Sequence, residues 1–291
     1  MRDEVVFAAD KHYAPHLATA IYSLLSNNAS ESFRVSVINT DLDESDFNKL
    51  RQIADPFDCK LNNLKVSDDL FEECVLGHHF KKSNYYRLLI PELLNANRAL
   101  YLDSDIVVLG SIKYLLDVNL QGKPVAAVQD PGFTWHSRLG MSENAGYFNS
   151  GVMILDLERW RRDSIASRVL EFVRAYPTAI QFVDQCGINA ILNGEWLVLP
   201  LEYNVQSVFL SGDLPELHSD PTSILGNAKI VHFTGSSKPW QLNNKHPYKR
   251  HYWRYRNKTA YRNYLADDVS FINILRFITP NPLKSFVRRF R

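Results

Sequence analysis

The sequence is poor in cysteine and has neither a long apolar run nor a low-complexity segment. Its three cysteines, Cys59, Cys74 and Cys186, are widely spaced and form no Cys-x-x-Cys pair. This argues against a disulfide framework or a structural zinc site and is typical of a reducing cytosol. No apolar run reaches the roughly 18 residues that a membrane-spanning helix needs, and residues 1–4 lead into a strand-like segment without a signal-peptide pattern. We therefore expect a cytoplasmic chain and no membrane-spanning anchor in this sequence.

What the sequence does contain is typical of a globular protein. Its 291 residues, 45% hydrophobic and 22% charged, are enough for one large domain or two small ones. The net charge of +1 hides an asymmetry, because residues 241–291 hold 12 of the 33 Lys and Arg but only 2 of the 32 Asp and Glu. This segment carries +10 and the rest of the chain −9. We predict a main domain at residues 1–240 and a basic, aromatic C-terminal extension at residues 241–291.

Strand-like and helical patterns alternate along the main domain. We predict strands at residues 4–9, 33–39, 61–66, 99–102, 124–129, 151–155 and 228–233. Helices are predicted at residues 14–26, at 45–53 with Ser45 as N-cap, at 83–89 ending before Pro91, at 164–176 and at 184–192. This alternation predicts an α/β fold with a mostly parallel sheet.

The most informative segment is residues 98–108, where an apolar strand pattern delivers two carboxylates one residue apart, Asp103 and Asp105. The strand should end there, and ligands of open α/β sheets bind at the carboxyl ends of strands. On an extended backbone both side chains point to the same side, where two carboxylates repel each other unless a divalent cation lies between them. Their oxygen atoms suit Mg²⁺ and Mn²⁺. The alternative is an acidic turn between two strands.

Four further segments accompany Leu102-Asp103-Ser104-Asp105. They are Ala8-Ala9-Asp10, residues 147–152 (YFNSGV), Val183-Asp184-Gln185 and residues 231–240 (VHFTGSSKPW). In this order and spacing the segments resemble glycosyltransferase family 8, and most closely its bacterial lipooligosaccharide galactosyltransferases and lipopolysaccharide glucosyl- or galactosyltransferases. The resemblance runs from about residue 4 to residue 240. It implies a GT-A fold with a Rossmann-like sheet, a nucleotide-sugar donor and retention of the anomeric configuration.

The resemblance also implies roles for single residues. Asp103, Asp105 and His232 would bind Mn²⁺ or Mg²⁺, and Lys238 with the backbone of Gly235 would hold the diphosphate. The remaining nucleotide contacts would be Ala8, Asp10 and Tyr13 to the uridine, Ser104 to the ribose, and Arg87 to the donor sugar and diphosphate. Four of these residues have a purely structural alternative: a core histidine for His232, a solvated charge for Lys238, a helix cap for Asp10 and a surface arginine for Arg87. His12 stands where close family members have asparagine, and Trp240 is explained by packing behind the turn.

Recognition of the donor sugar would fall to Asp130, Asn149, Asp184 and Gln185, because sugar hydroxyls need paired donors and acceptors. Asp130 and Asn149 are also ordinary turn residues. Family members commonly carry Asp-Gln-Asp where this chain has Asp184-Gln185-Cys186, which leaves one acid fewer near the anomeric carbon. We expect front-face attack within an ion pair, with Gln185 stabilising the cationic sugar and Asp184 as the alternative nucleophile.

Two other functions compete with transfer of a galactose or glucose from a UDP-sugar to a saccharide. A sugar-nucleotide nucleotidylyltransferase would share the architecture and the metal carboxylates, but residues 8–12 are not the Gly-rich, basic phosphate loop it would need after the first strand. A non-catalytic nucleotide-sugar-binding module would keep the fold and lose the metal ligands, whereas both aspartates and the histidine are present.

The extension at residues 241–291 points to a further partner. Residues 271–278 and 286–291 mix Phe, Ile, Leu and Val with Arg, a composition that suits an anionic membrane surface. No nucleic-acid fold signature accompanies it, so we expect no nucleic-acid partner. We expect peripheral attachment to the inner face of a membrane, where a glycolipid acceptor would lie. The alternative is that the segment packs as helices on the catalytic domain.

Overall fold

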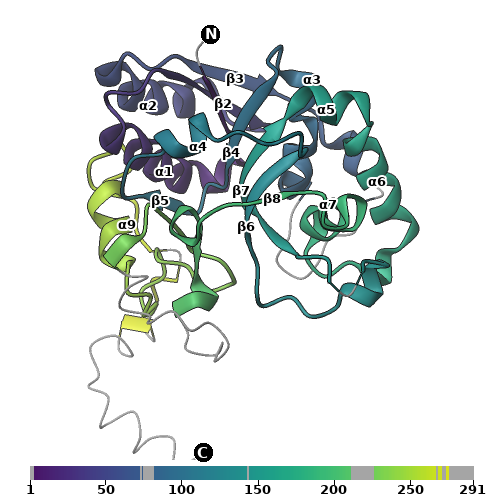
Figure 1. Cartoon of the computed structure of the whole chain (residues 1–291). Coiled ribbons are helices and arrows are strands. Elements are labelled where there is room, and N and C mark those ends of the chain that lie inside the picture. The colour runs from purple at the N-terminus through teal and green to yellow at the C-terminus, as the bar shows by residue number, and fades with distance from the viewer. Residues whose placement is uncertain are drawn as a thin grey trace, which may run out of the picture.

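A seven-stranded sheet forms the centre of the computed structural model, which describes residues 3–72, 74, 82–142, 144–210, 226–266, 268–270 and 273–274 (Figure 1). Its strands are β1 (Asp3–Ala8), β2 (Phe33–Asn39), β3 (Leu61–Lys65), β4 (Arg98–Leu102), β6 (Val125–Gln129), β7 (Phe148–Asp156) and β8 (Leu197–Val198). They lie in the order β3-β2-β1-β4-β7-β6-β8. All neighbours pair in parallel except β7, which runs antiparallel to β4 and β6. The expected mostly parallel sheet is confirmed.

A second, smaller sheet was not expected from the sequence. It joins β5 (Ile106–Val108), β10 (Ile230–His232) and β9 (Val205–Gln206) in that order. The strand predicted at residues 228–233 therefore belongs to this sheet and not to the central one. Strands of two or three residues give no usable alternation pattern. The pairing is nonetheless important for the site, because it sets His232 opposite Ile106, directly after Asp105.

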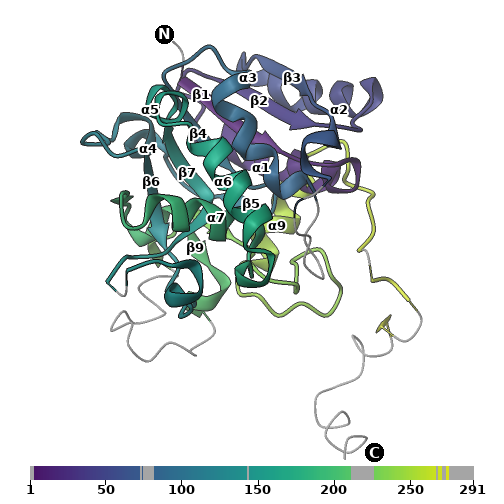
Figure 2. The ribbon, with the colours of Figure 1, turned by 90° about the vertical axis from the view of Figure 1, so that its right-hand side faces the viewer.

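Helices cover both faces of the central sheet (Figure 1 and Figure 2). One face packs against α1 (Ala14–Asn27) and α2 (Glu44–Ala54), and the other against α3 (Ile90–Leu93), α5 (Leu157–Arg162), α6 (Ile165–Ala175) and α7 (Val183–Leu192). Alternate side chains of β1 pack into the two helical layers: Val5 and Phe7 pack on the side of α1, and Val6 packs into the opposite layer. Burial on both faces explains why β4 and β6 are almost uniformly apolar.

One local prediction is wrong, and another is right in its bounds but incomplete. Asp43, not Ser45, caps α2, because Asp43 accepts from the backbone N–H of Asp46 while the Asp46 side chain accepts from the N–H of Asp43. The helical structure predicted to end before Pro91 continues past this residue. A 3₁₀ helix, η4 (Lys82–Leu89), continues directly into α3. Pro91 lies in the first turn of α3, where a backbone N–H would have no partner within the helix, so the missing N–H of proline costs nothing there.

The first part of the C-terminal extension packs against the main domain. Helix α9 (Lys249–Arg256) lies beside α1 (Figure 1). Tyr248 and Tyr252 join Phe233 and Trp240 in one buried cluster, and the hydroxyl of Tyr252 lies 2.7 Å from Nδ1 of His16. The boundary expected near residue 240 thus falls inside a packed cluster.

The membrane-binding segments proposed for the extension lie almost wholly outside the described residues. Of residues 271–278 and 286–291, the structure describes only 273 and 274. Among the residues it does describe, no helix has both the length and the apolar character required to span a bilayer.

Candidate functional site

A cleft of about 580 Å³ lies where β1 and β4 end and the second sheet begins. Its lining includes every residue singled out from the sequence as a site candidate: Ala8, Asp10, Tyr13, Arg87, Asp103, Ser104, Asp105, Asp130, Asn149, Asp184, Gln185, His232, Gly235 and Lys238. The position of the cleft is the usual one for a ligand site in an open α/β sheet, at the carboxyl ends of the strands. Residues from distant parts of the chain are thereby brought together, while their roles stay predictions.

The two carboxylates converge, but not along an extended backbone. β4 ends at Leu102, and Ser104 and Asp105 form a turn that leads into β5. Ligand atoms of Asp103, Asp105 and His232 all lie within 4.8 Å of one another. Among the described residues, no other three His, Cys, Asp or Glu side chains meet in this way. Two carboxylates and an imidazole form a donor set that fits Mn²⁺ or Mg²⁺.

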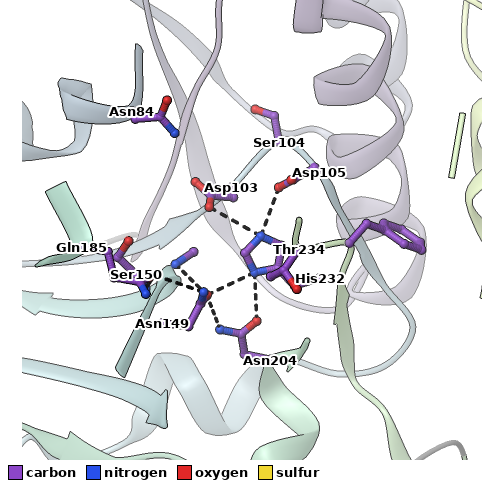
Figure 3. A network of polar contacts seen from close by, with 12 residues as sticks. Asn84, Asp103, Ser104, Asp105, Asn149, Ser150, Gln185, Asn204, His232 and Thr234 are labelled. Carbon is purple, nitrogen blue, oxygen red and sulfur yellow. Dashed lines mark hydrogen bonds and ion pairs between the residues drawn. The ribbon is translucent and has the colours of Figure 1, made fainter. Parts of the chain in front are cut away.

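His232 is buried, yet it is not an ordinary core histidine. Its Nε2 lies 3.1 Å from Oδ1 of Asp105 and 3.6 Å from Oδ2 of Asp103 (Figure 3). Its Nδ1 faces two carboxamide oxygens on the other side of the ring, those of Asn149 and Asn204, each at 3.1 Å. The ring therefore presents one nitrogen to the carboxylates and anchors the other in the protein.

Gly151 makes room for this histidine. A Cβ atom on Gly151 would lie 2.1 Å from Cε1 of His232 and 2.7 Å from Oδ2 of Asp103. No real Cβ contact is this short, so any side chain at position 151 would displace the ring or the carboxylate. Gly151 stands within the segment of residues 147–152, but its place in the sequence predicts no such role.

Arg87 is a buried cation and not a surface arginine; it is 3% exposed. Its Nη2 lies 2.9 Å from Oδ1 of Asp103, its Nε 3.1 Å from Oδ2 of Asp184, and its Nη1 2.7 Å from the carbonyl oxygen of Ser150. Burial lowers the pKa of Arg87, but the two carboxylates outweigh burial and raise the pKa above its ordinary value. Oδ1 of Asp103 also accepts a 2.7 Å hydrogen bond from Tyr101, which leaves Oδ2 facing His232.

Lys238 is also held in the site. Its Nζ contacts Oδ2 of Asp105 and donates to the carbonyl oxygen of Phe233 at 2.6 Å. Burial alone would raise the pKa of Asp105, but the ammonium group of Lys238 holds it well below its usual range. Behind this turn Trp240 is buried and stacks on the ring of His16, with 3.5 Å between ring centroids. Gly235 adopts a φ of +82°, which favours glycine.

Asp10, for which the sequence allowed a uridine contact or a helix cap, does act as a cap and also lies at the cleft. Asp10 caps the short 3₁₀ helix η1 (Lys11–Tyr13) by accepting from the N–H of Tyr13 at 3.0 Å, and it also lines the cleft. The hydroxyl of Ser104 donates to the carbonyl oxygen of Ala8 at 2.8 Å. This bond ties the turn after β4 to the end of β1.

Gln185 is held in a defined orientation. Its Oε1 accepts from the N–H of Ser150 at 3.0 Å and from Nδ2 of Asn149 at 3.1 Å, while its Nε2 donates to Oδ2 of Asp130 at 3.1 Å. Asp130 also accepts from the N–H of Gly132, as a turn residue does. Burial raises the pKa of Asp184 to about 6, with Arg87 opposing the shift.

The backbone is strained at the start of α7. Val183, just before Asp184, has a φ of +30°, a strained conformation for a β-branched residue that costs on the order of 1–3 kcal/mol.

Cys186, which stands where the resemblance to the family leads us to expect an acid, does not line the cleft. Its Sγ lies 3.3 Å from the hydroxyl of Tyr147 in a buried apolar cluster. Position 186 therefore lies behind the cleft in this chain, where the side chain packs and does not face the cleft.

Other residues of the site were given no role from the sequence. Tyr101, Ser150, Asn204 and Gln206 either line the cleft or hold those that do. Tyr101 and Ser150 stand within segments that were noted for other residues. Asn204 and Gln206 match no motif, and the residues they contact, Asn149 and Gln129, lie far away in the sequence.

Comparisons with known proteins agree on one family. Residues 4–244 match the family described as glycosyl transferase family 8. The chain is 34% identical to general stress protein A of Bacillus subtilis, over 88% of this chain and 94% of that protein. It is 28% identical to the lipopolysaccharide 1,2-glucosyltransferase of Escherichia coli, over 81% of this chain and 72% of that protein. A crystal structure of the galactosyltransferase LgtC with donor and acceptor sugar analogues has a TM-score of 0.80 to this fold, at 23% identity, and covers 88% of this chain and 96% of that one.

We predict that Gly151→Ala weakens Mn²⁺ binding by about tenfold or more, because the new methyl group must displace His232 or Asp103. Mn²⁺ affinity can be measured by electron paramagnetic resonance of the free ion. Gly226→Ala is the matched control, since a Cβ there meets nothing within 4 Å. Equal Mn²⁺ affinity in the wild type and Gly151→Ala would contradict the prediction.

Proposed function

Since the chain belongs to glycosyltransferase family 8 and has the GT-A fold, we propose that it is a metal-dependent, retaining transferase that moves galactose or glucose from a UDP-sugar to a saccharide. One observation carries the proposal beyond the family. Two carboxylates and an imidazole converge within 4.8 Å of one another, in a cleft that also holds a buried arginine and a lysine. Such a site suits a cation together with a diphosphate.

The metal would be held by Asp103, Asp105 and Nε2 of His232. The low pKa of Asp105 keeps this carboxylate ionised, as a ligand must be. When bound, the ion would neutralise the negative charge that grows on the leaving diphosphate. Lys238 lies beside Asp105 and would add a second positive charge on the same group.

The remaining residues suit the nucleotide and the sugar. Asp10 and Ala8 lie at the end of β1, where their polar atoms would meet the uracil edge, and Tyr13 would stack on the base. Ser104 would contact the ribose. Arg87, Asp130, Asn149 and Asp184 would hold the hydroxyls of the donor hexose.

We propose front-face attack for the transfer step. The bond from the anomeric carbon to the diphosphate breaks, the acceptor oxygen bonds to the same face of that carbon, and a diphosphate oxygen takes the acceptor proton. Gln185 is uncharged and therefore a poor nucleophile, but its oxygen is fixed by the N–H of Ser150 and can stabilise a cationic sugar. Asp184, the alternative nucleophile, is buried and has Oδ2 paired with Nε of Arg87, which makes that oxygen less available for attack.

The acceptor would be part of a cell-surface glycan. The Escherichia coli relative is named for a lipopolysaccharide reaction, and the family resemblance includes lipooligosaccharide enzymes. We propose that this chain acts in lipopolysaccharide, lipooligosaccharide or related glycan synthesis at the cytoplasmic side of a membrane.

We also propose that the catalytic body continues to about residue 264 and that the residues beyond it attach the enzyme to an anionic membrane. Residues 271–278 and 286–291 mix Phe, Ile, Leu and Val with Arg. Apolar side chains interleaved with cations suit a surface of anionic lipids, and the exposed Arg250, Arg254 and Lys258 of the preceding segment would add positive charge.

The metal proposal predicts that chelation abolishes slow hydrolysis of UDP-galactose or UDP-glucose and that added Mn²⁺ restores it. Asp103→Asn and Asp105→Asn should each lower the rate by about a hundredfold or more, because each removes a ligand and a charge opposite the leaving group. Release of UDP measures the rate. Asp117→Asn, at an exposed aspartate outside the cleft, serves as control. Full activity in excess chelator would refute metal dependence.

The stereochemical proposal predicts an α linkage in the product formed from the α-linked donor. Gln185→Ala should slow transfer strongly and leave UDP affinity nearly unchanged, because Gln185 is assigned to the sugar and not to the nucleotide. Proton NMR of the product reports the anomer, and calorimetry reports UDP binding. A β-linked product would exclude retention.

The membrane proposal predicts that the full chain co-sediments with vesicles of phosphatidylglycerol and less so as salt is added. A chain that ends after Ala266 should lose this binding and keep slow UDP-sugar hydrolysis. Residue 266 is the chosen end because the carbonyl oxygens of Tyr261 and Tyr264 accept hydrogen bonds from Arg256. Phosphatidylcholine vesicles are the control. Equal binding by both chains would remove the membrane role from the residues after 266.

A further inference from the structure

The side of His232 that faces away from the carboxylates is enclosed by two asparagines. Asn149 lies at the start of β7, and Asn204 directly precedes β9. Both place a carboxamide oxygen 3.1 Å from Nδ1 of His232 (Figure 3). Asn204 is 0% exposed, so water cannot easily take over its contacts. Neither the family resemblance nor the proposed function gives Asn204 a role.

The direction of each hydrogen bond around Nδ1 follows from one backbone group. The N–H of Gly151 can only donate, and it lies 3.0 Å from Oδ1 of Asn149, which orients that carboxamide. Asn204 lies 2.9 Å from the same oxygen, so it must present its NH₂ group there. The oxygen of Asn204 then faces Nδ1 of His232. Two acceptors now point at Nδ1, and this nitrogen must carry the proton.

We propose that Asn204 is a positioning residue that holds His232 as its Nδ1–H tautomer. In that tautomer the lone pair of Nε2 points to the side of Asp103 and Asp105, where a metal ligand needs it. The opposite tautomer would leave Nδ1 as an acceptor that faces two carbonyl oxygens in a buried place, an arrangement with no hydrogen bond and no room for a cation. The lone pair that the Nδ1–H tautomer turns toward Asp103 and Asp105 would instead be satisfied by the cation that these carboxylates bind. The inference rests on the metal site of the proposed function.

The same network links the metal site to the sugar side of the cleft. Nδ2 of Asn149 donates to Oε1 of Gln185, and the next backbone N–H along, that of Ser150, donates to the same oxygen. Consecutive N–H groups of β7, Ser150 and Gly151, thus orient Gln185 and Asn149. Asn204 completes only the branch that ends on His232, so its removal should disturb the metal site more than Gln185.

The test compares Asn204→Leu with the wild type by two readouts that do not depend on turnover. Leucine has a similar size and can neither donate to Asn149 nor accept from His232. Titration with Mn²⁺ alone, followed by electron paramagnetic resonance, should show affinity weaker by about tenfold or more. Long-range proton–nitrogen NMR of the imidazoles, at alkaline pH where histidine is neutral, should show the Nδ1–H form of His232 in the wild type and a mixture in Asn204→Leu. His232→Gln identifies the signal by its loss.

Asn39→Leu is the matched control, because Asn39 is an equally buried asparagine whose partners, Val37, Asn63 and Leu42, lie outside the cleft. It should leave Mn²⁺ affinity and the tautomer of His232 unchanged. An Nε2–H tautomer in the wild type would overturn the proposal even if Asn204→Leu failed to fold. Equal Mn²⁺ affinity and an unchanged tautomer in a folded Asn204→Leu would overturn it too. A wild type that binds no Mn²⁺ would instead refute the metal site, a separate result.

Discussion

The whole cleft depends on neutralising two acidic side chains that meet at the end of β4. Partly buried carboxylates this close to each other are costly unless cations and hydrogen-bond donors compensate them. Arg87 compensates Asp103 from η4, and Lys238 compensates Asp105 from the turn after β10. Because these two cations come from segments far apart in the chain, charge compensation also fixes the second sheet and η4 against the central sheet. The architecture and the chemistry of the site therefore share the same ion pairs.

Much of the fold follows from the sequence because its determinants are local. The strands at the centre of the sheet have β-branched, apolar sequences, and the helices between them have clear amphipathic or capping patterns, so both were predicted close to their observed bounds. The second sheet was not predicted, since β5 and β9 are too short to show periodicity and the predicted strand at β10 does not reveal which sheet it joins. Packing of the C-terminal extension on the main domain was only the alternative expectation. The polar, basic sequence of α9 gives no sign that Tyr252 is buried, and its contact with His16 spans most of the chain.

For the candidate site, a resemblance to a family, more than local physics, led to the residues that line one cleft. From the residues alone, Arg87 could be a surface arginine and His232 a core histidine. Their contacts exclude the surface arginine, because Arg87 is enclosed by Asp103 and Asp184, and they show that the buried His232 presents Nε2 to the carboxylates. The supporting residues could not be found in this way. Asn204 and Gly151 matter only through the shape and polarity of the space around an imidazole that lies far along the chain.

The position of His232 and Lys238 in the second sheet and the following turn has a consequence for biosynthesis. Both residues, and the aromatic cluster that supports them, lie late in the chain, whereas Asp10, Arg87 and Asp103 emerge from the ribosome early. The central sheet can begin to form while the later segments are still being translated. Until residues 230–252 arrive, Asp105 lacks its partner Lys238, and the side of α1 that packs against α9 stays uncovered. A newly made chain therefore gains its complete cleft only in the final stage of folding, and a prematurely terminated one would be left with an open, acidic half-site.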